Sequence, residues 1–241
     1  MRPVVLLVTL SACGRLGFDE HIAGVTGDGP LGDGVQQGDG ASSSNAMLVQ
    51  QSGVVSGNGS VMVALPQPTL GGTFLVATIA GNDLSTFMAP SGWQNNASGS
   101  TSGACASAIV TEQNAPAGQS TITFTINTPC DVQVTEWRGL ANVDNGGFAS
   151  GTASTSLSVS TFTADSAAGD LAIASFCQDT TMPTYAAGAG WNALGQIARS
   201  AALPSMMAEY QTGEPKAKIT ATATSSLAAK YTGTIVTFQA P

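Results

Sequence analysis

The sequence contains few charged residues and almost no histidine. Only 9% of its 241 residues are charged, and His21 is the single histidine, whereas about 25% of a typical soluble domain is charged. The region after residue 45 has no histidine, which excludes a Ser-His-Asp or Cys-His catalytic site and a His-ligated zinc site there. The net charge of −8 also argues against nucleic acid as a partner, because phosphate recognition needs clustered Lys and Arg.

Motifs for nucleotide cofactors and for calcium are also lacking. Glycine-rich segments are common, but none follows the Gly-x-Gly-x-x-Gly or Walker A pattern between a strand and a helix. Asp28, Asp33 and Asp39 lie five and six residues apart (33−28, 39−33), which does not fit an EF-hand loop. We therefore expect no cofactor and no metal, with a loop calcium site near Asp144 or Asp179 as an open alternative.

No apolar run has the ~20 residues that a membrane-spanning helix needs. The N-terminus instead has Arg2, a short apolar run over residues 3–10 and then Ser11-Ala12-Cys13, the order typical of a secretory signal. Leu10-Ser11-Ala12-Cys13 resembles the lipobox of Gram-negative bacterial lipoproteins. This resemblance implies cleavage after residue 12, lipidation of Cys13 and a place in the cell envelope. Gly14, in the position where Asp retains lipoproteins in the inner membrane, favours the outer membrane.

Residues 13–45 are rich in Gly, Asp and Ser. Few apolar side chains are available there to offset the entropy cost of ordering. Gly- and Ser-rich segments behave as flexible chains. The sequence thus predicts a signal peptide over 1–12, a flexible tether over 13–45 and a folded domain over 46–241.

The folded region resembles itself at an offset of about 97 residues. The segment 72–77 recurs as 169–174, and Gly92-Trp93 recurs as Gly190-Trp191. Further matches at the same offset join Glu112 to Glu209 (209−112 = 97) and the segment 122–125 to 219–222. The repeat predicts two similar halves, about 46–141 and 142–241.

Both halves show strand patterns and no helical periodicity. Apolar and polar residues alternate over 121–126 and 218–223, as expected for half-buried strands. Four or five strands in each half predict an all-β fold: an antiparallel, jelly-roll-like β-sandwich built from both halves, with two small tandem sandwiches as the alternative. The strand and turn pattern, including Val134-Thr135-Glu136-Trp137-Arg138-Gly139-Leu140, resembles exported bacterial β-sandwich modules of a broad family that has no assigned function.

Three cysteines remain after Cys13: Cys105, Cys130 and Cys177. Cys105 and Cys130 are equidistant from a turn at residues 117–118 (105+130 = 117+118), so we expect them to form a cross-strand disulfide. The alternatives are a bond from Cys177 to one of them, or three free thiols.

Four aromatic residues are candidates for ligand binding. Trp93 and Trp191 occupy equivalent positions in the repeat. If their rings are exposed, they could stack on a sugar; if they are buried, they cover the end of a core. The core position is favoured. Trp137 and Tyr185 are weaker candidates for the same role.

These observations predict a non-enzymatic, lipid-anchored envelope protein. Its β-sandwich would bind a glycan or an envelope protein, and the membrane would be a partner through the N-terminal lipid. One alternative is a carbohydrate-active enzyme in which Glu112 and Glu209 act as paired carboxylates, although both look like strand ends that run into solvent. The other is a structural component without a specific ligand.

Overall fold

The computed structural model describes residues 46–241 apart from 102–104, 166–170, 200–203 and 214–216. Cys13, the expected signal peptide and the expected tether lie outside the described residues. Among the residues that are described, no helix is long and apolar enough to cross a membrane.

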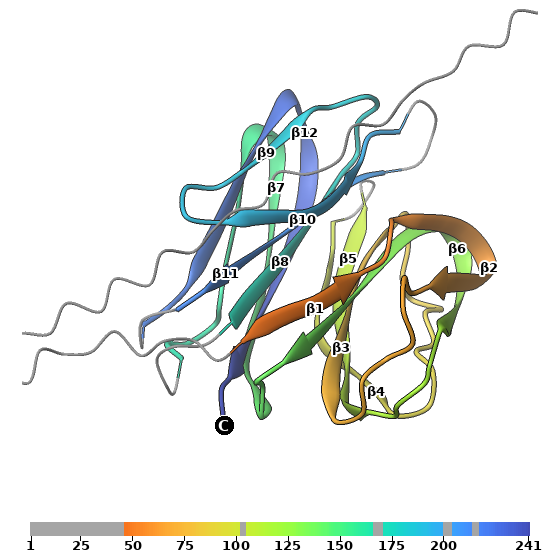
Figure 1. Ribbon diagram of the computed structural model, residues 1–241. Helices are drawn as coiled ribbons and strands as arrows, with labels where there is room; N and C mark the ends of the chain where they lie inside the picture. The colour runs from red at the N-terminus through yellow and green to blue at the C-terminus, as the bar shows by residue number, and fades with distance from the viewer. Residues whose placement is uncertain (1–45, 102–104, 166–170, 200–203, 214–216) are drawn as a thin grey trace, which may run out of the picture. The chain divides into compact units, whose positions relative to one another are not determined.

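The described chain consists of strands joined by turns and loops (Figure 1). In order they are β1 (Met47–Gln51), β2 (Val55–Ala64), β3 (Thr73–Gly81), β4 (Trp93–Ser100), β5 (Ala106–Ala115), β6 (Thr121–Arg138), β7 (Asn142–Ser160), β8 (Leu171–Gln178), β9 (Tyr185–Ala187), β10 (Asn192–Ile197), β11 (Ser205–Thr212) and β12 (Thr220–Gln239).

The strands form two six-stranded antiparallel sheets, and each half of the chain builds one of them. The first has the order β1-β6-β3-β5-β4 with β2 also paired to β6, and the second has the order β10-β11-β8-β12-β7 with β9 also paired to β12. The prediction of an all-β, two-halved antiparallel sandwich is confirmed. Among the described residues each half has six strands, not four or five, because short strands such as β1 and β9 join the sheets.

Equivalent strand pairs of the two sheets have the same register, but β12 contains an insertion that changes the offset between the halves. Phe74 pairs with Trp137 in the first half, and Leu171 pairs with Phe238 in the second. The offset is therefore 97 residues on one strand (171−74) and 101 on the other (238−137). The four extra residues lie between Thr224 and Tyr231, where the pairing of β12 with β7 shifts register twice. The repeat is thus retained in the sheet, and the insertion is confined to a bulge.

The long strands β6 and β12 let each half enclose a core of its own. The N-terminal part of β6 pairs with β2, and its C-terminal part pairs with β1 and β3. Side chains of β2, β3, β5 and both parts of β6 meet in one apolar cluster within the first half. A corresponding cluster fills the second half.

A third core lies between the two sheets. All nine residues of β3 are buried, because the strand has apolar neighbours on both faces. Leu75 and Ile79 belong to the core of the first half, whereas Phe74 and Val76 pack with Phe238 and other residues of the second half. A strand that serves two cores reads as a continuous apolar run, which explains the unbroken segment 74–77.

Polar groups add to the contact between the halves. The Ser107 and Thr234 hydroxyls lie 2.8 Å apart, and those of Thr101 and Thr232 lie 2.7 Å apart. Arg199 of the second half pairs through its guanidinium group with buried Asp131 of β6. The halves therefore form one sandwich and not two independent domains.

The prediction of a Cys105–Cys130 disulfide is wrong: Cys105 is bonded to Cys177, across the two halves. The segments around Cys105 and Cys130 are not neighbours, because β3 lies between β5 and β6. Gly81 of β3 pairs with Ala106 on one side and Cys130 on the other. Cys130 is buried in the core of the first half, whereas Cys105 and Cys177 belong to the core between the sheets.

Candidate functional site

Trp137 is part of the core between the sheets. Its side chain is fully buried, and its indole N–H donates to the Thr135 hydroxyl at 2.8 Å. Its ring meets the edge of Tyr210 with centroids 5.1 Å apart. The prediction that Trp137 lies on a ligand-binding surface is wrong, because neighbours in both halves cover it.

Trp93 and Trp191 pack against the separate cores of the two halves. Trp93 is half-buried and meets Phe124 edge-on at 5.2 Å, and Trp191 is buried. Trp191 belongs to the core of the second half and Trp93 packs against that of the first, which agrees with the core position that the sequence favoured. Tyr185 is half-buried beside the core of the second half, and burial raises the pKa of its hydroxyl. These aromatic residues thus do not form a shared ligand surface.

The two repeat-related glutamates lie in different places from those expected. Glu112 and Glu209 are both buried and do not extend into solvent. Glu112 lies opposite Leu75, a residue of the first core, whereas Glu209 lies opposite Ala174, a residue of the second core. The sheets therefore separate the two carboxyl groups, and the structure does not bring them together as a catalytic pair.

Burial changes the acidity of both carboxyl groups. Desolvation raises the pKa of Glu112, although a hydrogen bond from Trp93 partly opposes it. Desolvation raises the pKa of Glu209 to about 7, although its Oε2 accepts a hydrogen bond from the Gly188 N–H at 3.0 Å. Each carboxyl group faces the turn that contains the repeated Gly-Trp pair of its own half.

Metal-ligating side chains do not gather in the described part of the chain. No group of three or more His, Cys, Asp or Glu residues is placed there to share a metal ion. Asp144, one of the calcium alternatives, accepts a hydrogen bond from the Gln239 amide at 3.0 Å. Asp179, the other, is exposed in the turn after β8.

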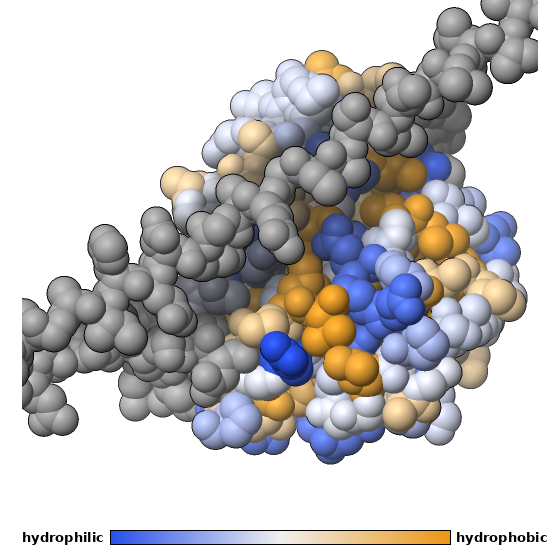
Figure 2. All heavy atoms as spheres, viewed as in Figure 1, coloured by the Kyte–Doolittle hydropathy of each residue, from blue (hydrophilic) through white to orange (hydrophobic). Residues whose placement is uncertain are grey.

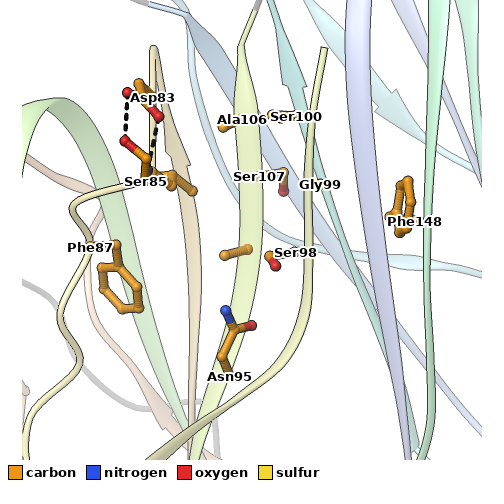
Figure 3. A pocket seen from close by; sticks show the side chains of 12 residues that line it. Asp83, Ser85, Phe87, Asn95, Ser98, Gly99, Ser100, Ala106, Ser107 and Phe148 are labelled. Carbon is orange, nitrogen blue, oxygen red and sulfur yellow. Dashed lines mark hydrogen bonds between the residues drawn. The ribbon is translucent and has the colours of Figure 1, made fainter.

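The structure places a pocket of about 450 Å³ beside β4 and β5, within the ~300–1,000 Å³ typical of ligand sites. Its lining comes from the loop after β3, from β4 and β5, and from one residue of β7. Figure 3 shows Phe87 toward one end and Phe148 toward the other, with Asn95, Ser98 and Ser107 between them. Aromatic rings thus accompany a polar row whose exposed members are Asn95 and Ser98, whereas the Ser107 hydroxyl is buried and bonded to that of Thr234.

Asp83 is fixed in place at this pocket. Its carboxylate accepts hydrogen bonds from the Ser85 N–H and from the Ser85 hydroxyl, each at 2.8 Å (Figure 3). These bonds lower the pKa of Asp83, because both stabilise the ionised form. The pocket therefore has one oriented negative charge at neutral pH.

Phe148 brings the second half of the chain into the pocket. It is 51% exposed, and its ring meets that of Phe162 edge-on at 5.6 Å. A Cβ atom added to Gly99 would lie 3.0 Å from the Phe148 Cβ, so the glycine lets the aromatic side chain lie close against β4. Phe87, on the loop after β3, stacks on the core residue Phe124 at 6.2 Å.

The surface of the molecule is chemically mixed. On the face seen in Figure 2, hydrophobic residues occur in several separate groups among hydrophilic ones. Phe148, Phe162 and Met88 are among the exposed large apolar side chains.

Sequence analysis missed this pocket because its residues come from distant segments. Phe87 and Phe148 are 61 positions apart (148−87), and they belong to different halves. The available signal was an aromatic residue in a polar, glycine-rich segment, as in Asn145-Gly146-Gly147-Phe148. Such a ring has no large apolar residue within four positions of it in the sequence and is a candidate for surface contact.

Comparisons of the chain with protein-family models, with curated proteins and with solved structures give no match.

Proposed function

We propose that this chain is a non-enzymatic, lipid-anchored protein of the cell envelope whose β-sandwich binds a ligand outside the membrane. The pocket between Phe87 and Phe148 carries the proposal, because it combines aromatic rings, an oriented carboxylate and small polar side chains in one concave site. In this proposal Cys13 carries the lipid anchor, residues 13–45 are the tether that links it to the domain, and the anchoring membrane is the outer membrane.

The way in which the pocket is built also supports binding. Phe148 of the second half lies against Gly99 of the first, so the packing between the halves fixes the shape of the site. The Cys105–Cys177 bond crosses the same contact next to Ala106, a residue of the pocket. A site held in shape by its framework binds with a smaller ordering cost.

A pocket-filling variant tests this proposal. Ser98 is exposed on β4 and lines the pocket, whereas Gln94 is exposed on the same strand outside it. The fragment 39–241 forms one compact unit and lacks the anchor, so its co-sedimentation with envelope and matrix material measures the domain alone. We expect Ser98→Trp to weaken binding about tenfold, which corresponds to ~1.4 kcal/mol, and Gln94→Trp to leave it unchanged. Equal binding by both variants, or no binding by the unmodified fragment, would contradict the proposal.

A further inference from the structure

We propose that the pocket binds a neutral saccharide of at least two sugar rings. This inference rests on the proposed function, because it names the class of ligand for the same pocket. It starts from the charge of the lining. Asp83 is the one charged side chain among the described residues of the pocket, and no Lys or Arg lines it. An anionic ligand such as a uronic acid or a phosphate would meet repulsion without a compensating cation.

The polar groups of the pocket match hydroxyl groups. Each ionised carboxylate has about four acceptor positions, and Ser85 occupies two of those of Asp83. Asn95 and Ser98 are exposed at the pocket, and neither side chain forms a hydrogen bond with another described residue. The amide of Asn95 both donates and accepts, as does the hydroxyl of Ser98. Sugar hydroxyls also do both, so a sugar ring satisfies all three residues.

The aromatic residues set the length of the ligand. Phe87 and Phe148 lie toward opposite ends of the pocket, with the polar row between them (Figure 3). The negative face of an aromatic ring attracts the partly positive C–H groups on the flat side of a pyranose. A chain of two or more rings would place one ring against each Phe and its hydroxyls along the polar row.

A cationic ligand fits these observations less well. It would pair with Asp83 and lie over an aromatic face. Asp83, however, is exposed, and solvent and salt screen the attraction between exposed charges. Such a ligand would also leave the hydrogen-bonding capacity of Asn95 and Ser98 unused.

The test is isothermal titration of the full chain in detergent micelles. The probes are neutral tetrasaccharides of glucose and of N-acetylglucosamine, the matching monosaccharides, an anionic oligogalacturonate and the cation choline. We expect one of the neutral tetrasaccharides to bind and its monosaccharide to bind at least about tenfold more weakly, because it reaches only one aromatic ring.

Substitutions inside and outside the pocket show where the saccharide binds. Phe148→Ala and Asp83→Asn should each reduce the affinity about tenfold. Leu227→Ala shortens an exposed apolar side chain outside the pocket and should leave the affinity unchanged. Thermal unfolding shows whether each variant is folded. Asp83→Asn changes an exposed side chain, so it remains informative if Phe148→Ala is unstable.

Three results would overturn the proposal. Tetrasaccharide binding that survives both pocket variants would place the sugar site elsewhere. Binding of oligogalacturonate or choline in place of the neutral sugars would give the wrong ligand class. If no probe binds while Ser98→Trp still weakens binding to envelope material, the saccharide inference fails and the proposed function stands.

Discussion

Glu209 makes the stability of this protein depend on pH in an unusual direction. The side chain lies on β11 and is fully buried. Its Oε2 accepts a hydrogen bond from Gly188, and its Oε1 has no hydrogen-bond partner among the described residues. Burial raises its pKa from 4.5 to about 7, because the ionised form loses its hydration.

The size of the effect follows from this shift. Each pKa unit corresponds to ~1.4 kcal/mol, so a rise of about 2.5 units (7−4.5) corresponds to roughly 3 kcal/mol. The folded protein holds a proton that the unfolded chain releases above pH 4.5. The contribution to stability is therefore fully present below pH 4.5 and is lost as the pH rises through about 7.

Glu209→Gln should remove this dependence, because the amide does not ionise. Urea unfolding followed by tryptophan fluorescence measures the free energy of unfolding at each pH. Between about pH 4.5 and about pH 8.5, the value for the natural chain should fall by roughly 3 kcal/mol relative to that of the variant.

Glu112→Gln provides a matched comparison in the other half. The pKa of Glu112 is also raised, so this variant should change the pH dependence in the same direction. The change should be smaller, because Trp93 donates a hydrogen bond to the ionised carboxylate. If Glu209→Gln follows the same pH profile as the natural chain, Glu209 ionises normally in the folded protein and the reasoning from its burial is wrong.

Three further predictions concern the anchor and the contact between the halves. Cys13→Ala should abolish labelling by radioactive palmitate and move the chain to the aqueous phase of a detergent separation; retention in the detergent phase would place the anchor elsewhere. Cys105→Ser should lower the free energy of unfolding by about 4 kcal/mol in urea, because the bond to Cys177 spans 72 positions of the unfolded chain; an unchanged midpoint would contradict this. Arg199→Ala should lower the free energy of unfolding by about 3 kcal/mol in the same assay, because it leaves buried Asp131 without its cation. Adding Asp131→Asn to this variant should recover part of the lost stability. No recovery would show that the unpaired charge is not the cause.

The fold class could be predicted because strand patterns are local. Alternation over 121–126 and the 97-residue repeat were both present in the sequence, and the structure shows them as matching strands of two sheets. Strand order is not local. The turn at 117–118 suggested that the segments around it pair with each other, yet β3, from much earlier in the chain, lies between them. The Cys105–Cys130 prediction failed for this reason.

The candidate site was harder to predict than the fold. The sequence singled out tryptophans and glutamates by residue type and by repetition, but most of them are buried in cores. Repetition in a duplicated fold preserves the residues that pack each half. Phe148 and Asp83 have no such repeated signal, and they line one pocket only because β7 lies beside β4.

By itself, the sequence determined the all-β class, the two halves and the lack of histidine in the folded region, because composition and periodicity follow directly from the chain. It also contains the lipobox-like segment on which the expected localisation in the cell envelope depends. Only the tertiary structure decided which cysteines are bonded, which face of each strand meets which core and which side chains line the pocket. These features depend on contacts between segments far apart in the chain, and the sandwich brings those segments together by burying apolar strands on both faces.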